Sequence, residues 1–432
     1  MKVKLAYGKN GLEVELPDHA YVLKPERLPP VPDPHAAITQ SLRQPISSRP
    51  LREKVRSDDT VAIVFNDITR PTPSHIILPP ILAELHEVGV PRESITLING
   101  LGMHRPNTRE ELVMLVGQEI VDNYRIEQHN AQDDSNLTYL YTNPRGVPVY
   151  INSHYMNASV RILTGFIEPH IFAGWSGGSK AVLPAVAGAE TIMANHNGPM
   201  IANPGSIWCH TTDNPIFMEM REVALSTNPT FMVNVTINEE RRITGVFGGE
   251  LAAAHDEGIA FAERAFVRQV PEEFDIAVAA HLGYPADINL YQSVKGLSVA
   301  AQGVRKGGSV ILCAECSEGL GLKHFEELLQ ARGSPEELLR LIEDPKFKHF
   351  DQWGVQIGAL AQVKVESYLY SSLPPESAKK AHMVPVANVE DAVQELSARC
   401  RQKNGGSDPR ILVLPHGQLT VPRVSNGNGA AK

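Results

Sequence analysis

The chain has 432 residues, and 40 Lys plus Arg against 49 Asp plus Glu give it a formal net charge of −9. This length exceeds the roughly 100 to 200 residues of one ordinary domain, so we expect at least two domains. The 42% hydrophobic fraction is typical of a globular chain, and the acidic balance excludes a basic surface for nucleic acid. No apolar run reaches about 18 residues, so the sequence predicts no membrane span and no membrane partner.

Cysteine content and the N-terminus bear on the compartment. Four cysteines in so long a chain do not form a disulfide framework, which indicates a reducing environment. Cys313 and Cys316 make a single CxxC without a second pair, and we interpret them as structural. The stretch MKVKLAYGKNGLEVELP lacks the continuous apolar core of a secretory signal. We therefore expect a cytoplasmic protein, and the sequence leaves its oligomeric state open.

Predicted strands and helices alternate along the first part of the chain. A hairpin over residues 3–17 precedes strands at 60–66, 95–100 and 161–167 and helices at 75–89 and 107–117. Thr108 and Glu111 have the spacing of a capping box, which marks the start of a helix. Such alternation favours an α/β fold with a mainly parallel, doubly wound sheet.

A second α/β domain is predicted from a change in composition. The polar stretch RQVPEEF at 268–274 separates the first domain from a new apolar strand. We predict an N-terminal domain over 1–270 and a C-terminal domain over 275–405. A final strand and a disordered tail would occupy residues 406–432.

Polar side chains follow the predicted strands of the first domain. Asp67 and Arg70 follow the first strand in DITRP, His104 follows the second, and His170 follows the third. The carboxyl ends of parallel strands are where α/β proteins bind ligands, and arginine is well shaped to bind a carboxylate or phosphate. An Asx-turn and a surface arginine explain Asp67 and Arg70 equally well.

The densest chemical signal is GFIEPHIFAGWSGGSKAVLPAVAGAETIMANH, at residues 165–196. A glycine-rich loop ahead of a helix can present backbone N–H groups to an anion such as phosphate. GWSGGSK departs from the P-loop, because Lys180 follows Ser179 and no Ser or Thr comes after it. The alternative is a flexible turn with a solvated lysine, which leaves the flanking His170 and His196 unexplained.

In the second domain, NLYQSVKG places three functional side chains within five positions. On a helix, Lys295 shares one face with Tyr291 and Gln292. A lysine and an amide on one face could bind a small carboxylate or hydroxyl group. The alternative is an amphipathic helix start with a solvated lysine, and Trp353 is either core or the wall of a pocket.

These stretches, together with DQWG near residue 353, resemble the nickel-pincer-dependent lactate racemases and their 2-hydroxy-acid racemase and epimerase relatives. The resemblance implies a nickel-pincer nucleotide, pyridinium-3-thioamide-5-thiocarboxylic acid mononucleotide nickel, joined to Lys180 by a thioamide. It implies His196 as the protein ligand of nickel (Ni). It also implies partner enzymes that mature this cofactor and a small 2-hydroxy-acid substrate.

The resemblance further assigns the other residues. His104 and His170 match the acid/base pair of a reversible hydride transfer. The matched cofactor-binding positions are Asp67, Gly174, Ser176, Gly177, Gly178 and Ser179. The matched substrate-binding positions are Arg70, Tyr291, Gln292, Lys295 and Trp353, most of them in the C-terminal domain. Which 2-hydroxy acid is used does not follow from the sequence.

Two other functions remain open at this point. His104, His170 and His196 could form the zinc triad of a hydrolase, with Lys180 supporting a substrate anion. Alternatively, the glycine-rich loop alone could serve a non-catalytic nucleotide-binding module, which would tolerate loss of the histidines.

Overall fold

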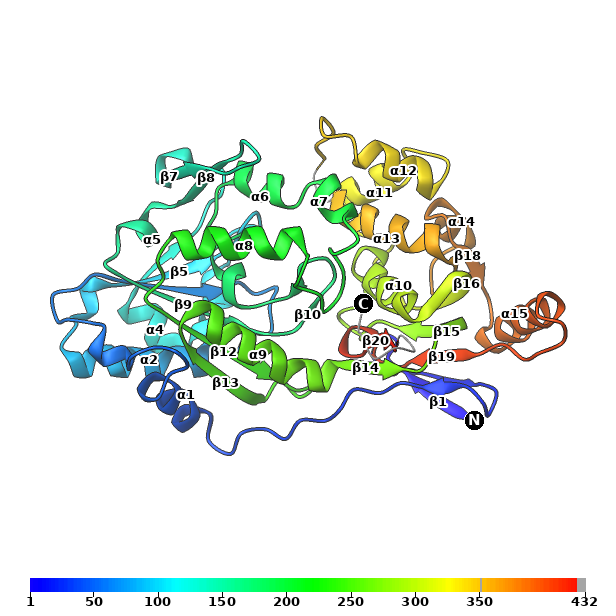
Figure 1. Ribbon diagram of the computed structural model, residues 1–432, viewed down its shortest axis with the longest axis horizontal. Coiled ribbons are helices and arrows are strands. Elements are labelled where there is room, and N and C mark those ends of the chain that lie inside the picture. Colours follow the sequence, from blue (N-terminus) through cyan, green and yellow to red (C-terminus); the bar gives the residue numbers. More distant parts are fainter. Residues whose placement is uncertain (350–351, 426–432) are drawn as a thin grey trace. The chain divides into compact units, whose positions relative to one another are not determined.

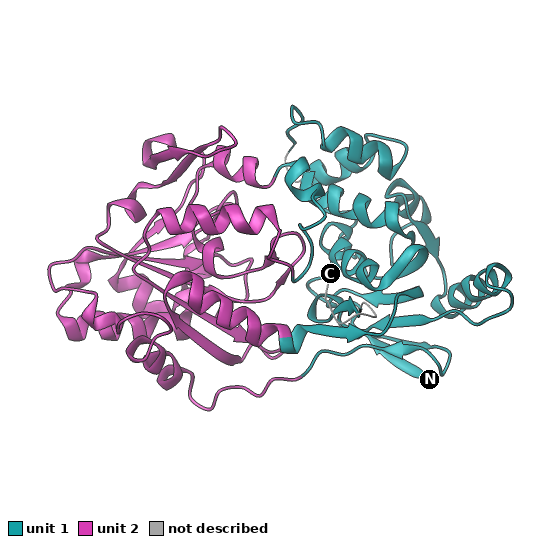
Figure 2. Ribbon diagram, viewed as in Figure 1, with its two compact units in different colours: residues 1–26, 197–209, 264–432 teal, residues 27–196, 210–263 magenta. Residues whose placement is uncertain are grey.

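The computed structural model describes residues 1–349 and 352–425. The chain divides into two compact units, each built from segments far apart in the sequence (Figure 2). Unit 1 contains residues 1–26, residues 197–209 and the described residues from 264 onward. Unit 2 contains residues 27–196 and 210–263.

The centre of unit 2 is a six-stranded sheet in the order β13-β12-β9-β4-β5-β6 (Figure 1). Its strands are β4 (Val61–Asn66), β5 (Ile95–Gly100), β6 (Arg125–Gln128), β9 (Val160–Phe166), β12 (Phe231–Ile237) and β13 (Ile243–Gly249). Only the β12 and β13 pair is antiparallel. The mainly parallel, doubly wound sheet is therefore confirmed. The strand order reverses between β4 and β9, and ligands commonly bind at the carboxyl edge beside such a reversal.

Helices enclose this sheet. They are α1 (Pro34–Arg43), α2 (Ser74–Val88), α3 (Arg109–Val116), α4 (Gln118–Asn123), α5 (Ser153–Asn157), α6 (Ala189–Asn195), α8 (Pro215–Ser226) and α9 (Leu251–Phe266). The predicted Thr108–Glu111 capping box is present at the start of α3. α2 continues through Pro79 and Pro80, although each interior proline costs about 3 kcal/mol. Several fully buried aliphatic side chains of α2 in the core offset that cost, at about 1.5–3 kcal/mol each.

Short elements complete unit 2 at the carboxyl edge of the sheet. They are the hairpin of β7 (Leu137–Thr142) and β8 (Pro148–Asn152), the pair β10 (Pro169–His170) and β11 (Gly174–Trp175), and the 3-10 turn η4 (Gly178–Ala181). Three further 3-10 turns are η1 (Leu51–Glu53), η2 (Arg92–Ser94) and η3 (Asp134–Asn136). We expected a helix directly after the glycine-rich loop, and this prediction is wrong. The second half of the loop forms a single 3-10 turn, η4, and the next helix, α6, begins only at Ala189.

Unit 1 has its own six-stranded sheet, in the order β18-β17-β16-β15-β19-β3, with every pair parallel. Its strands are β3 (Tyr21–Val22), β15 (Phe274–Ala280), β16 (Val304–Cys313), β17 (Glu366–Tyr370), β18 (Val384–Val386) and β19 (Ile411–Leu414). Its helices are α7 (Gly198–Ala202), α10 (Leu290–Gly303), α11 (Lys323–Leu329), α12 (Pro335–Ile342), α13 (Gln352–Lys364), α14 (Pro375–Lys380) and α15 (Val389–Lys403). The apolar strand predicted after the polar stretch and the final strand predicted beyond residue 405 are present as β15 and β19.

Pairing between the two ends of the chain explains how unit 1 is composed. The predicted hairpin exists as β1 (Lys2–Leu5) and β2 (Leu12–Glu15), and its apolar side chains join the core of the unit 1 sheet. β3 pairs with β19, and β14 (Val267–Val270) pairs with β20 (Val421–Val424), which the turn η5 (Gly417–Leu419) precedes. The predicted domains were continuous and divided at 270–275. The units divide at 263/264, and the first 26 residues group with the C-terminal part.

Two further predictions concern the C-terminal tail and the absence of a membrane-spanning helix. Most of the tail that we predicted to be disordered lies beyond residue 425, outside the described residues. None of the helices in the described part of the chain is both long and apolar enough to span a membrane.

Candidate functional site

Residues that follow the strands of unit 2 meet at the carboxyl edge of its sheet. Asp67 follows β4, and His104 lies four residues after β5. The Nδ1 atom of His104 lies 2.7 Å from Oδ2 of Asp67, and the Asp67 side chain is buried while His104 is half-exposed. Because a carboxylate can only accept, Nδ1–H donates to Asp67 and Nε2 carries the free lone pair. His104 is thereby oriented as a base.

His170, on β10, lies after β9 at the same edge. Its Nδ1 atom accepts a hydrogen bond from the Ala173 amide at 3.2 Å, so its proton is on Nε2 when the ring is neutral. The imidazoles of His170 and His196 each pack edge-to-face against Phe172, with ring centroids 4.7 Å and 5.1 Å away. Phe172 therefore contacts both imidazoles.

The zinc-triad hypothesis finds no support in this arrangement. Within residues 1–349 and 352–425, no group of three His, Cys, Asp or Glu side chains is placed to hold a metal ion. His104 uses Nδ1 for Asp67, and His170 uses Nδ1 for a backbone amide.

The glycine-rich loop folds back on the chain. Gly174, Gly177 and Gly178 have φ values of 74°, 81° and 52°, a region that favours glycine. The Ser176 amide donates to Glu168 O at 2.9 Å, and the Lys180 amide donates to Gly177 O at 3.1 Å. These two N–H groups are thus unavailable to an anion, as are those of Trp175 and Gly178, which donate to Ala173 O and Asn234 Oδ1. A phosphate contact from this loop stays a prediction for its remaining N–H groups.

Lys180 lies on η4, and burial changes its acidity. Burial, together with the nearby positive charge of Arg70, lowers the pKa of Lys180 to about 7, while the negative charge of Glu168 acts in the opposite direction. A large fraction of this amine is therefore neutral near pH 7, and a neutral lysine amine is a nucleophile. The structure also brings Arg70 close enough to Lys180 for their charges to interact.

His196 immediately follows α6. Burial and the charge of Lys180 lower the pKa of His196 to about 3, so the ring is neutral at physiological pH. Its Nδ1 atom and the Oγ atom of Ser179 are buried and have no hydrogen-bond partner among the described residues. A neutral imidazole with an unpaired nitrogen suits nickel. These orphaned atoms, beside a neutral amine, fit a metal-bearing group attached at Lys180.

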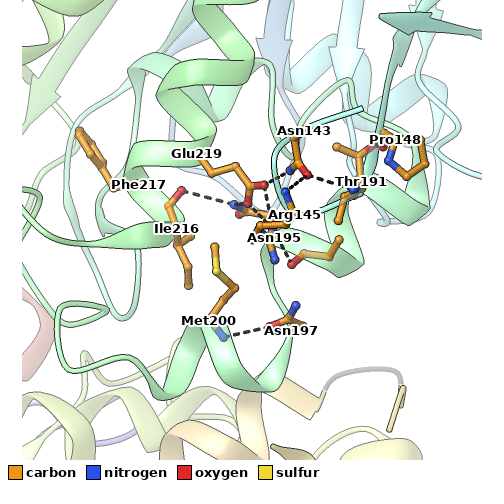
Figure 3. A network of polar contacts seen from close by, with 12 residues as sticks. Asn143, Arg145, Pro148, Thr191, Asn195, Asn197, Met200, Ile216, Phe217 and Glu219 are labelled. Carbon is orange, nitrogen blue, oxygen red and sulfur yellow. Dashed lines mark hydrogen bonds and ion pairs between the residues drawn. The ribbon is translucent and has the colours of Figure 1, made fainter. Parts of the chain in front are cut away.

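Glu219 of α8 contacts Asn195 and Arg145 (Figure 3), and Asn195 is the last residue of α6, directly before His196. The Glu219 carboxylate accepts from Asn195 Nδ2 at 2.8 Å and from Arg145 at 2.6 Å, and it also accepts from Asn143. Arg145 donates in addition to the Ala194 carbonyl at 3.1 Å. Sequence reasoning missed this network, because its members are separated by 24 to 76 positions and form no local pattern.

Hydrogen bonds join predicted substrate-side residues of unit 1 to one another. Lys295 Nζ donates to Gln292 Oε1 at 2.8 Å on α10, which confirms the predicted helix and shared face. Trp353 Nε1 donates to the Tyr291 hydroxyl at 3.3 Å. His281, at the end of β15, was missed. Burial and the charge of Lys295 lower its pKa to about 3.

The predicted structural role of the CxxC cysteines agrees with their surroundings. Cys313 and Cys316 are buried and free, and burial raises the pKa of both thiols, to about 12 for Cys316. Thiols with such raised pKa values are inert.

Family models and relatives match nearly the whole chain. Residues 7–208 match the lactate racemase N-terminal domain, and residues 269–421 match the lactate racemase C-terminal domain. The chain is 36% identical to the lactate racemase of Lactiplantibacillus plantarum over 384 residues, which cover 88% of this chain and 89% of that protein. It is 30% identical to the lactate racemase of Thermoanaerobacterium thermosaccharolyticum over 438 residues, which cover 98% and 99%.

Solved structures give the same result. The lactate racemase apoprotein from Thermoanaerobacterium thermosaccharolyticum aligns with a TM-score of 0.89 and 28% identity, over 98% of this chain and 100% of that one. A Thermotoga maritima protein aligns over 91% and 99% with a TM-score of 0.63, and at 15% identity it shows the fold alone. With these matches beside the geometry of the strand-end residues, the chain belongs to the lactate racemase family.

Proposed function

We propose that this protein interconverts the two enantiomers of a short 2-hydroxy acid of the lactate type, with a nickel-pincer nucleotide attached to Lys180. The observation that carries the proposal is that unit 2 holds both an oriented imidazole, His104 on Asp67, and a buried Lys180 whose amine is partly neutral near pH 7. Membership of the lactate racemase family supports the same reaction.

Hydride chemistry explains the choice of residues. Removing the α-hydrogen as a proton is difficult, because the carboxylate already carries the charge that an enolate would have to share. When bound, the cofactor supplies an acceptor that takes the α-hydrogen as hydride and later returns it. His104 Nε2 then takes the hydroxyl proton, and the substrate becomes a planar 2-keto acid. From the other side, His170 would give a proton to the oxygen of the keto acid as it is reduced on its opposite face, which completes the inversion.

Two histidines suit this symmetrical task. Each enantiomer presents its hydroxyl group on a different side, so one base is needed on each side. An imidazole with a reference pKa near 6.5 can both accept and return a proton near neutral pH. His104 and His170 reach their orientations through different partners, Asp67 and the Ala173 amide.

Cations and a polar pair would bind the substrate carboxylate. Arg70 lies near Lys180 in unit 2, and the hydrogen-bonded Gln292 and Lys295 lie on α10 of unit 1. We assign these three residues to carboxylate binding, with Tyr291 and Trp353 as further substrate contacts. His196 would hold nickel through its unpaired nitrogen. We further propose that the protein works in the cytoplasm, and that separate maturation enzymes supply the cofactor.

Lys180 provides the decisive test. Protein produced together with the maturation enzymes should carry a covalent adduct on Lys180 and about one nickel per chain, and it should racemise a 2-hydroxy acid in a panel that includes lactate. Lys180→Arg keeps the positive charge but removes the nucleophile, so it should carry no adduct. Intact mass and peptide mapping measure the adduct, and nickel analysis measures the nickel content. An adduct on a different lysine, or equal nickel in the arginine variant, would disprove the attachment.

A further inference from the structure

The loop at residues 174–180, which we call the attachment loop, is held by two polar side chains that are distant in the sequence. His255 Nε2 on α9 lies 3.0 Å from the Ser176 carbonyl oxygen. Asn234 Oδ1 on β12 accepts from the Gly178 amide at 2.6 Å. The two side chains are at most 1% exposed. They restrain the loop on either side of Gly177.

The hydrogen bond of His255 fixes its tautomer. Because a carbonyl oxygen only accepts, Nε2 carries the proton and Nδ1 is bare. Nδ1 is buried without a hydrogen-bond partner among the described residues, and the ring stacks on Phe217 with centroids 5.9 Å apart. Burial lowers the pKa of His255 to about 4, so the donor form persists at neutral pH.

The loop needs glycine at positions 177 and 178 because Asn234 and His255 lie so close to its backbone. A Cβ atom on Gly177 would overlap Asn234 Oδ1, and a Cβ atom on Gly178 would overlap the His255 ring. The loop therefore lies directly against both side chains, and Lys180 follows two positions later. Replacing either polar group by an apolar one would leave a buried backbone group of the loop unpaired, which costs about 1–3 kcal/mol.

We propose that His255 and Asn234 are positioning residues that hold the attachment loop, and with it Lys180, in the conformation that receives the cofactor. The restraint of the loop stands on the contacts alone, whereas its purpose rests on the proposed function. The experiment therefore measures the loop and the attachment separately.

Matched pairs of variants test the restraint in apoprotein. His255→Met and His255→Gln have similar length, but only glutamine can donate to Ser176. Asn234→Leu and Asn234→Asp form the second pair, in which only aspartate keeps the acceptor for Gly178. His86→Leu is the control, since His86 contacts the Val90 carbonyl oxygen at 3.0 Å beyond the end of α2 and does not contact the loop.

Amide hydrogen exchange reports on the loop directly. Peptides covering residues 174–182 should exchange about tenfold faster in His255→Met and Asn234→Leu, as expected for loss of one hydrogen bond. Peptides covering β4 should keep the parent rate, and the Gln and Asp variants should return toward it. A uniform rise across unit 2 would indicate a general loss of stability and would overturn the proposal.

Two further measurements complete the test: the extent of cofactor attachment to Lys180 and the tautomer of His255. After coexpression with the maturation enzymes, the fraction of Lys180 that carries an adduct should fall several-fold in the Met and Leu variants and recover with Gln and Asp. Equal loading in all variants would overturn the proposal, as would ¹⁵N spectra of the parent that place the His255 proton on Nδ1. If His255→Met does not fold, the Asn234 pair and the spectra decide. A parent without any adduct would instead refute the proposed function and leave the loop restraint intact.

Discussion

At the scale of single residues, the two candidate bases differ in what orients them. His104 depends on the carboxylate of Asp67, whereas His170 depends on a backbone amide three residues away. A side-chain partner can be removed by mutation, and a backbone partner cannot. The two halves of the reaction can therefore be separated by changing one histidine at a time.

Single replacements should give opposite preferences in the loaded enzyme. His104→Ala and His170→Ala should each lose racemisation in both directions by about 10²- to 10⁴-fold, because every inversion uses both bases. Each variant should still oxidise one enantiomer, and the two variants should prefer different enantiomers. Release of 2-keto acid and change in cofactor absorbance, measured with each pure enantiomer, test this.

The comparison needs a control for cofactor content. Nickel and adduct on Lys180 are quantified in each variant, so that a loss of rate is not a loss of loading. His154→Ala serves as a histidine control, since His154 lies on α5 and contacts Arg125 and Glu127 of β6. Two variants that prefer the same enantiomer, or that keep rates within a few-fold of the parent, would refute the two-base mechanism.

The sequence was sufficient to predict which functional residues lie at strand ends. It was only partly sufficient to predict the residues that they contact. Asp67, His104 and His170 were expected together, because the carboxyl ends of parallel strands meet at one edge. Asn234 and His255 gave no local signal, since their contact with the loop depends on the packing of β12 and α9. The glycine pair was the only trace of that contact in the sequence.

At the scale of elements, the short helix α6 illustrates stabilisation by a distant carboxylate. α6 has seven residues, too few to be stable alone. Its last turn is held by Glu219 and Arg145, which come from α8 and the β7–β8 hairpin (Figure 3). The position of His196 therefore depends on elements on both sides of it in the sequence.

Loss of that carboxylate should loosen α6. Glu219→Gln keeps the size of the side chain but turns an amide group toward donors, and we expect it to destabilise the protein by about 1–3 kcal/mol. Thermal unfolding measures the loss, and nickel content of matured protein should fall with it. Glu376→Gln is the control, because Glu376 is 76% exposed in its pair with Lys379, and such pairs contribute about 0–1 kcal/mol. Equal effects of the two variants would contradict the role of Glu219.

The helices and strands of the structure show which sequence patterns were sufficient to predict an element. The capping box of α3 and the buried run of β4 are local patterns, and both were predicted. The prediction of a helix after the glycine-rich loop was wrong. The chain forms a 3-10 turn there, and Asn234 and His255, from distant elements, bind the Gly178 amide and the Ser176 carbonyl oxygen. Local sequence does not contain that tertiary contact.

At the scale of the whole molecule, buried neutral histidines should make stability depend on pH. Burial lowers the pKa of His129, and it lowers the pKa of His255 to about 4 and that of His281 to about 3. The unfolded chain protonates these groups near pH 6.5, so below that pH it binds more protons than the folded protein. Stability is complete above about pH 6.5 and should fall as the pH drops toward 4.

The melting temperature from pH 8 to 4.5 measures this dependence. Each unit of pKa difference corresponds to about 1.4 kcal/mol, so the decline should be clear by pH 5. His255→Gln removes one titrating group and should flatten the slope. Paired carboxylates such as Glu111, with a pKa of about 2, lose their contribution only at lower pH. A constant melting temperature between pH 7 and 5 would contradict the prediction.

The composition of unit 1 was beyond sequence reasoning, because β3 and β19 are two short strands paired over a very large separation. Tyr21 pairs with Leu412, and Val22 pairs with Val413. Neither strand has a sequence pattern that identifies the strand it pairs with, so we expected domains that are continuous in the sequence. The α/β class and the parallel sheet of each unit did follow from the alternation of strands and helices.

This pairing has a consequence for the order in which the protein is made. β3 is among the first strands to leave the ribosome, yet its partner β19 is synthesised roughly 20–80 s later at about 5–20 residues per second. Unit 2 has its whole chain available once residue 263 has emerged. The sheet of unit 1 cannot be completed until translation is almost finished, and β3 has no partner strand until then. A message truncated after residue 405 would therefore yield a protein in which β3 has no strand to pair with, whereas the β1–β2 hairpin would still find its core partners in β15, β16 and α15.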